Sequence, residues 1–229
     1  VYLYLLKLLL MQTLLVHINN ACFSRCQFCY KVNEVNNDES FFYRTIADDA
    51  VVYLRQHPEV NNILLTGGDP MMLSNEALSY ILGKFSGLPQ IRGIRIATKT
   101  LSFYPIRFLD EELLSILSDC NKKKKHISVI AQISHPAEFS AKMIEAVEKI
   151  QKTGASIRSQ PVLTHGINDD VKVLTALFQK AYDCKIVPYY LVHFMPVRGV
   201  EQYALPIDEA YKIVAQLSAE LSGLEKKSI

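Results

Sequence analysis

Short, nearly continuous apolar runs alternate along the chain with longer segments in which apolar residues recur every three or four positions. The short runs are typical of strands that are covered on both faces, and the longer segments are typical of amphipathic helices. Such alternation predicts an α/β fold, either a partial (βα)6 barrel of parallel strands with outer helices or an open doubly wound sheet. The expected strands are 14–18, 62–70, 91–98, 127–134, 156–163 and 185–194, and the expected helices are 45–56, 75–85, 110–119, 140–154, 169–182 and 207–221.

The first 18 residues are strongly apolar and are interrupted by Lys7, Gln12 and His17. This run is shorter than the ~20 residues that a membrane-spanning helix needs. It also lacks the basic region and the cleavage site of a secretory signal. We expect a core helix followed by a core strand here. They would belong to a single domain over residues 1–229, whose native chain extends further at its ends.

The composition excludes only those functions that require an extreme net charge. The net charge of +2 gives no electrostatic footprint for nucleic acid or for an anionic membrane, so neither is an expected partner. The basic run Lys122–Lys125 precedes an expected strand and is interpreted as a solvated loop, with an anion-binding patch as the alternative. Self-association stays open.

Five cysteines, three of them bunched, do not form the pattern of a secreted disulfide framework. Cys120 and Cys184 stand alone in or beside apolar helical segments, which predicts buried thiols. Exposed thiolates in the bunched group would oxidise outside a reducing compartment, so we expect the protein to be cytoplasmic.

The bunched cysteines Cys22, Cys26 and Cys29 have the spacing CxxxCxxC and follow the first expected strand. Ligands bind at the carboxyl ends of parallel strands, so the loop stands where a site is expected. Four thiolates ligate all the irons of a [4Fe–4S] cluster, and three leave one iron open to a substrate or cofactor. Zinc is the alternative metal and would require a fourth ligand, such as His17.

A second feature is the stretch LLTGGDP over 64–70, where two glycines follow an expected strand. Glycine lets the backbone approach a ligand closely and exposes its amides and carbonyls. Thr66, Gly67, Gly68 and Asp69 are therefore candidates for a cofactor site. The alternative is a simple strand-to-helix turn with Asp69 near a helix start.

The cysteine loop resembles the signature of the radical S-adenosylmethionine (SAM) superfamily, which has an aromatic residue before the third cysteine, here Phe28. The resemblance implies a partial (βα)6 barrel and a [4Fe–4S] cluster on Cys22, Cys26 and Cys29 whose open iron chelates SAM. It also implies an electron donor such as flavodoxin or ferredoxin, which triggers cleavage of SAM to a 5′-deoxyadenosyl radical. Phe28 would pack near the adenine, and the turn over 66–69 would bind the methionine end.

Further stretches resemble the lysine 2,3-aminomutase family over most of residues 14–221. Members of that family couple the radical to pyridoxal phosphate (PLP) and move an amino group between adjacent carbons of a small amino-acid substrate. Ser134, His135 and Gln160 match strand-end positions that line the cofactor cavity, with a satisfied core hydrogen bond as the alternative role for each. The matching stretches are ILLTGGDPMMLSNEALSYIL, IRIATKT, SHPAEFSAKMIEAVEKIQKTGASIRSQPVLTHGINDD and VPYYL.

Several departures from that family concern the substrate. Met195 stands where lysine-specific enzymes have an aspartate, and Lys99 stands where an arginine pairs with the substrate carboxylate. Lys99 offers charge without a bidentate fork. Tyr30 replaces a small polar residue. No glycine-rich PLP-lysine segment occurs, and the tail residues Lys226 and Lys227 lack its pattern.

Two other functions stay open at this stage. One is a radical SAM domain that acts on a different substrate without PLP, and the other is a non-catalytic metal-binding domain.

Overall fold

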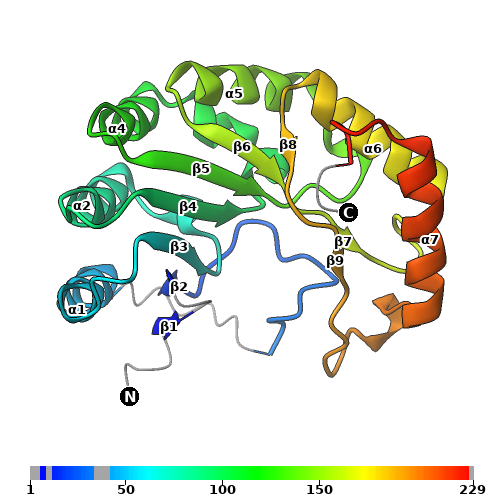
Figure 1. Cartoon of the computed structure of the whole chain (residues 1–229), viewed down its shortest axis with the longest axis horizontal. Coiled ribbons are helices and arrows are strands. Elements are labelled where there is room, and N and C mark those ends of the chain that lie inside the picture. The colour runs from blue at the N-terminus through cyan, green and yellow to red at the C-terminus, as the bar shows by residue number, and fades with distance from the viewer. Residues whose placement is uncertain (1–5, 9–11, 34–41, 227–229) are drawn as a thin grey trace.

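The computed structural model describes residues 6–8, 12–33 and 42–226. Six parallel strands, β2, β3, β4, β5, β6 and β8, form one curved sheet, and β1 pairs antiparallel with β2 at its edge. Helices lie along the outside of the sheet (Figure 1). This is the predicted partial barrel of parallel strands with outer helices. The strands are β1 (Leu6–Leu8), β2 (Thr13–Asn19), β3 (Asn62–Gly67), β4 (Gly93–Thr98), β5 (His126–Ala131), β6 (Ser156–Ser159), β7 (Val162–Leu163), β8 (Val187–Pro188) and β9 (Val192–His193). The α-helices are α1 (Tyr43–Gln56), α2 (Asn75–Ser86), α3 (Thr100–Phe103), α4 (Glu111–Lys122), α5 (Ala141–Lys152), α6 (Val171–Asp183) and α7 (Ile207–Glu220).

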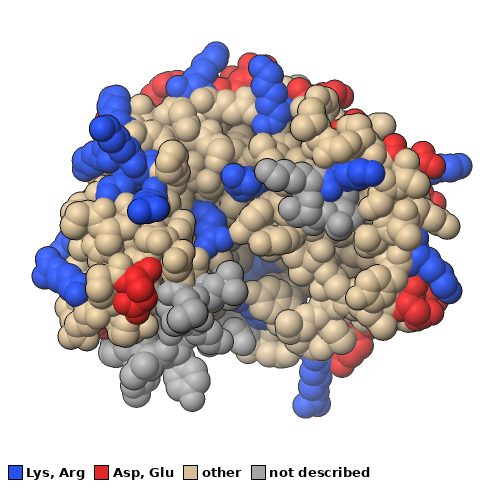
Figure 2. Space-filling model, viewed as in Figure 1, with Lys and Arg blue, Asp and Glu red and all other residues tan. Residues whose placement is uncertain are grey.

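The loop after β2, which carries the three bunched cysteines, crosses the open side of the barrel toward β7 and β9 (Figure 1). Figure 2 shows the same side in space-filling form. Basic side chains border the hollow near the centre of this view, and most acidic side chains lie nearer the outline of the molecule. The carboxyl ends of the strands therefore open into a space that the cysteine loop partly covers.

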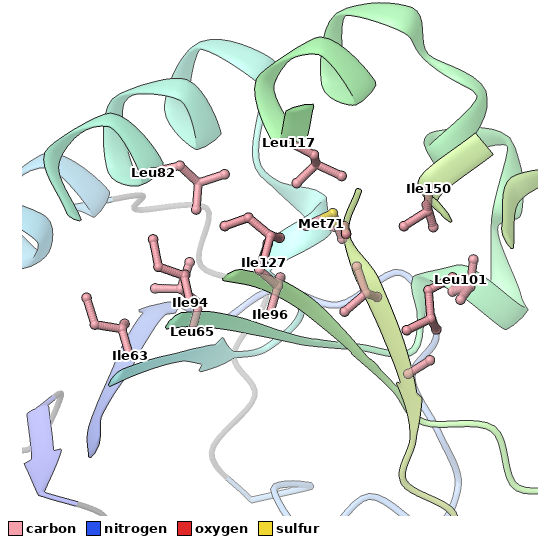
Figure 3. Close-up of a cluster of buried hydrophobic side chains, with 14 of the residues drawn as sticks. Ile63, Leu65, Met71, Leu82, Ile94, Ile96, Leu101, Leu117, Ile127 and Ile150 are labelled. Atoms are coloured by element: carbon pink, nitrogen blue, oxygen red, sulfur yellow. The ribbon is translucent and has the colours of Figure 1, made fainter. Parts of the chain in front are cut away.

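Alternation along each strand separates a buried outer face from an inner face. Outward residues such as Leu65 and Ile96, which are register partners, are fully buried under the helices. Their inward neighbours Thr66 and Ala97 are only half-buried. Figure 3 shows the outer core, where strand residues Ile63, Leu65, Ile94, Ile96 and Ile127 meet helix residues Leu82, Leu117 and Ile150.

Side-chain caps fix the starts of four helices. Ser74, Asp110, Ser140 and Asp170 each accept a hydrogen bond from a backbone N–H in the first turn. After α5, Gly154 takes a positive φ of 85°, as a glycine that closes a helix does.

Two long expected strands are wrong in extent. The strand expected over 156–163 ends at Ser159, because Pro161 has no N–H for the sheet. The chain then leaves the main sheet, and β7 pairs in parallel with β9 instead. The strand expected over 185–194 is likewise divided, and its first part, β8, ends at Pro188. These breaks create a small second sheet beside the barrel opening.

The apolar start of the chain also differs from expectation. Leu6–Leu8 is a strand with Leu6 opposite Val16, not part of a core helix. Pairing with the edge of an existing sheet satisfies its backbone, which a local hydrophobicity pattern does not reveal. The remaining part of the expected helix lies outside the described residues. Within the described ranges, no helix combines the length and apolarity needed to cross a bilayer.

The basic run lies mostly in solvent, as predicted. Lys123 and Lys124 are exposed in the turn between α4 and β5. Lys125 differs because its ammonium donates to the carbonyls of Leu88 at 2.9 Å and Ile91 at 2.7 Å. It therefore closes the end of α2 rather than forming an anion-binding patch.

Candidate functional site

A cavity of about 730 Å³ lies at the carboxyl ends of the parallel strands. The cysteine loop, the ends of β3 and β4, and β9 line it. Its size falls in the ~300–1,000 Å³ range of ligand-binding sites. The candidate chemistry was expected at this end of the strands, and the cavity lies there.

All three bunched cysteines line this cavity. Tight turns shape the loop, with the Cys29 N–H donating to the Cys26 carbonyl at 3.1 Å and the Val32 N–H donating to the Cys29 carbonyl at 3.0 Å. The Ser24 hydroxyl lies 3.4 Å from the Cys26 sulfur. None of the cysteines forms a disulfide.

The surroundings of Cys22 disfavour a bare thiolate. Burial, followed by the negative charges of Asp69 and of the other two cysteines, raises the pKa of the Cys22 thiol to about 12. A bound metal reverses this effect, because coordination deprotonates a thiol. The donor set therefore suits an iron–sulfur cluster. As positioned, no group of three or more His, Cys, Asp or Glu side chains in the described ranges could hold a metal ion. Cluster binding would require the loop to draw its thiols together.

The two glycines of the LLTGGDP turn are explained by the close approach of the chain to itself. A Cβ on Gly67, whose φ is 140°, would lie 2.2 Å from the Asn19 carbonyl oxygen, and one on Gly68 would lie 2.1 Å from the Ala21 carbonyl oxygen. The Gly68 N–H donates to Asn19 and the Asp69 N–H donates to Ala21, both at 2.7 Å. The turn thus supports the base of the cysteine loop. From the sequence, the glycines were expected to allow close approach of a ligand, with a simple strand-to-helix turn as the alternative.

Asp69 connects the ends of β3 and β4. Its buried carboxylate accepts hydrogen bonds from the hydroxyls of Thr98 at 2.7 Å and Thr100 at 2.9 Å. The backbone N–H groups of Met71, Lys99 and Thr100 also donate to it. Asp69 lines the cavity, but these donors already occupy its oxygens. The alternative role, a cap near a helix start, describes its contact with Met71 N–H.

Lys31, two residues after the last cysteine of the loop, was not among the candidate residues. It is 9% exposed, and its ammonium donates to the Gly67 carbonyl at 2.8 Å inside the cavity. The sequence did contain a signal for Lys31, because it is a basic residue next to a loop expected to bind a metal. The pairing with Gly67 depends on folding and could not be predicted from the sequence.

Lys99 lines the cavity and forms an ion pair. Its ammonium lies 2.7 Å from the Glu138 carboxylate, and the two side chains are 14% and 22% exposed. The other Glu138 oxygen accepts from the backbone N–H groups of Ser134 and His135. Sequence analysis missed Glu138, which fixes both the lysine and the turn after β5.

The three polar residues at the ends of β5 and β6 have different positions. Gln160 lines the cavity, and its backbone N–H donates to the Ala131 carbonyl. Ser134 and His135 are outside the cavity lining. The Ser134 carbonyl accepts from the buried Asn168 amide, and the His135 ring accepts from the Ala137 N–H. The His135 ring thus makes the local hydrogen bond given as its alternative role, whereas the buried Ser134 hydroxyl has no hydrogen-bond partner among the described residues.

Aromatic and apolar side chains form another wall. Phe28 lines the cavity and meets the ring of Tyr203 edge-on at 6.4 Å. The Tyr203 hydroxyl donates to Gln27 at 3.3 Å, which connects the cysteine loop to the segment before α7. Met195 lines the cavity from beyond β9 and is 63% exposed. Thr66 completes the lining beside the glycine turn.

No protein-family model matches the chain. Its relatives include a candidate L-lysine 2,3-aminomutase of Aquifex aeolicus (strain VF5), which is 35% identical over 93% of this chain and 57% of the relative. The glutamate 2,3-aminomutase of Clostridioides difficile (strain 630) is 28% identical over 92% of the chain and 49% of the relative. The L-lysine 2,3-aminomutase of Clostridium subterminale is 28% identical over 91% of the chain and 49% of the relative. The chain thus spans about half the length of the curated relatives it matches.

Solved structures resemble the fold at low sequence identity. Native anSMEcpe with bound AdoMet superposes with a TM-score of 0.65 at 13% identity, over 90% of this chain and 58% of that one. A radical SAM methyltransferase from Sphaerobacter thermophilus gives a TM-score of 0.63 at 14% identity, over 94% of this chain and 66% of that one.

These solved structures share with the chain the fold of a partial barrel of parallel strands with outer helices. The curated proteins that the chain resembles in sequence are named as lysine and glutamate 2,3-aminomutases.

Proposed function

We propose that the protein is a radical SAM enzyme of the aminomutase type. The observation that carries the proposal is that three cysteines of one loop and the glycine turn face a single cavity at the carboxyl ends of the strands. Sequence similarity to curated aminomutases supports the same chemistry.

Cys22, Cys26 and Cys29 would hold a [4Fe–4S] cluster. The reduced cluster supplies the electron that cleaves SAM, and an external donor such as flavodoxin or ferredoxin would reduce it. The chain itself would orient SAM. Phe28 would pack on the adenine, and the Gly67 carbonyl would accept from the methionine ammonium. The Lys31 ammonium donates to the same carbonyl, and we expect it to move aside when SAM binds.

The substrate would be a small amino acid whose amino group shifts between adjacent carbons. Lys99 would meet the substrate carboxylate at the cavity wall, while Glu138 keeps its ammonium in place. Gln160 would contribute to the same wall. PLP is the cofactor that the family implies, and the lysine that would hold it is not identified in this sequence. A reducing, cytoplasmic location would preserve the thiolates.

A second candidate is radical SAM chemistry without PLP. It is favoured by one observation, namely that Ser134 and His135 do not line the cavity. Absorbance of added PLP, measured with and without the amino acid, separates the two candidates. A protein that cleaves SAM but never perturbs the PLP spectrum would support the second.

Anaerobic reconstitution tests the metal site. Wild-type protein should contain four irons and four sulfides per chain, and Cys26→Ala should lose most of both. Cys184→Ala is the matched control, because this half-buried cysteine lies at the end of α6, away from the cavity lining. Stoichiometric zinc in place of iron, or full iron in Cys26→Ala, would refute the assignment.

A further inference from the structure

Lys31 is a buried cation beside the cysteines to which the resemblance assigned no role. It stands two residues after Cys29, and it lines the same cavity as the three cysteines. The residue is only 9% exposed, and a charge removed from water is costly unless fixed dipoles or an opposite charge compensate it. The Gly67 carbonyl, which accepts from the ammonium at 2.8 Å, supplies such a dipole.

The hydrogen bond to Gly67 connects the two ends of the cysteine loop. The glycine turn supports the start of the loop through the Asp69 N–H, which donates to the carbonyl of Ala21, the residue before Cys22. Lys31 follows the last cysteine and reaches back to the same turn. Its ammonium therefore brings a positive charge from one end of the loop to the turn at the other end.

The charges that act on Cys22 are mostly negative. Burial, the Asp69 carboxylate and the other two cysteines each raise the pKa of its thiol, and the Lys31 ammonium acts in the opposite direction. Of the other cations in the described lining, Lys99 is neutralised by an ion pair. Arg25 is exposed to solvent, where salt screens its charge. Lys31 is thus the cation of the described lining that is both buried and felt at the cysteine site.

A cluster on these cysteines would be sensitive to that charge. Three thiolates outweigh the positive charge of an iron–sulfur core, and reduction adds one more negative charge. A fixed cation nearby stabilises the reduced form more than the oxidised form, because Coulomb attraction grows with the charge it acts on. The net charge around a cluster is accordingly one of the factors that set its reduction potential.

From these contacts we infer that Lys31 is a positioning residue of the cluster site, whose ammonium, held by the Gly67 carbonyl, raises the reduction potential of a cluster on the three cysteines. The inference rests on the proposed function, because it requires that cluster. Lys31 acts through its charge on the cluster and not through contact with a substrate. A higher potential makes the transfer of one electron from the external donor to the cluster more favourable.

A redox titration of the anaerobically reconstituted full chain tests this inference. SAM is left out, because it would compete with the ammonium for the Gly67 carbonyl. The reduced cluster is followed by its electron paramagnetic resonance signal, which reports only on chains that contain a cluster. Lys31→Met should weaken the equilibrium constant for reduction by at least about tenfold, which is about 59 mV for one electron. Lys31→Gln, which keeps an N–H donor without a charge, should show the same shift, whereas Lys31→Arg should retain most of the wild-type potential.

Lys123→Met is the matched control, because it removes the same charge from the exposed turn after α4. Its cluster should have the wild-type potential. If the clusters of Lys31→Met and Lys31→Gln also keep the wild-type potential, Lys31 has a structural role alone, and the inference is overturned while the proposed function stands. Should Lys31→Met hold no cluster, the potential of Lys31→Gln decides in the same way. Iron and sulfide content and SAM cleavage by the wild type report on the proposed function separately. A wild-type protein without a reducible cluster would overturn the proposed function and this inference with it.

Discussion

Replacing Gly68 by alanine should damage the cysteine loop as well as any SAM site. The added Cβ would lie 2.1 Å from the Ala21 carbonyl oxygen and 2.5 Å from its carbonyl carbon. The distance to the oxygen is more than an ångström shorter than an ordinary van der Waals contact. Both partners are backbone atoms, so no side chain can rotate away. Relief requires separating β3 from the base of the loop.

The cost follows from the contacts that such a separation weakens. Overpacking a filled site costs about 1–3 kcal/mol. The hydrogen bonds from Gly68 N–H to Asn19 and from Asp69 N–H to Ala21 contribute about 1 kcal/mol each. Together, we expect Gly68→Ala to lower the free energy of unfolding by about 2–5 kcal/mol. For a chain of this size, that corresponds to a decrease in Tm on the order of 10 °C.

Thermal unfolding followed by circular dichroism, together with iron content after reconstitution, measures both consequences. Gly83→Ala is the control, because Gly83 lies in α2 with nothing within 4 Å of the added Cβ. That variant should gain roughly 0.5–1 kcal/mol through helix propensity. A Gly68→Ala protein with the Tm and iron content of the control would refute the packing explanation for the glycine turn.

Two further predictions concern an ion pair and a thiol. Lys99→Met leaves the partly buried Glu138 carboxylate without its partner and should lower the free energy of unfolding in urea by about 1–3 kcal/mol. The control Lys142→Met breaks an exposed ion pair in α5 and should lower it by under about 0.5 kcal/mol. Equal losses in the two variants would contradict a special role for the Lys99–Glu138 pair. Burial raises the pKa of the Cys120 thiol, so native protein at pH 8 should leave Cys120 unmodified by iodoacetamide, as measured by peptide mass spectrometry. The less buried Cys184 should react sooner, and rapid labelling of Cys120 in the native protein would contradict its burial.

Local signals in the sequence predicted alternating strands and helices, which left a partial barrel and an open doubly wound sheet both possible, and the family resemblance implied the barrel. The hydrophobic period located the main helices to within a few residues, because this signal acts within one helix. The division of the late strands was missed, since the effect of Pro161 on the sheet depends on which neighbour the chain finds next. The edge strand Leu6–Leu8 was missed for the same reason.

The candidate site was predicted in outline only. The cysteines, the glycine turn, Lys99 and Gln160 line one cavity because all follow parallel strands, which the alternation already indicated. The pairing of Lys99 with Glu138 joins two loops that are 39 residues apart. Contacts of this kind depend on the folded arrangement of both loops, so neither the ion pair nor the support that Gly67 and Gly68 give to the cysteine loop could be predicted from a local pattern.

Formation of 5′-deoxyadenosine from SAM tests the central claim most directly. The anaerobically reconstituted chain is reduced with dithionite and incubated with SAM, and the product is quantified by liquid chromatography and mass spectrometry. Wild-type protein should form 5′-deoxyadenosine and methionine in equal amounts, Cys184→Ala should do the same, and Cys26→Ala should form neither. Absence of product from a wild-type protein with a full complement of iron and sulfide, or equal product from Cys26→Ala, would contradict the assignment of a radical SAM site to this cavity.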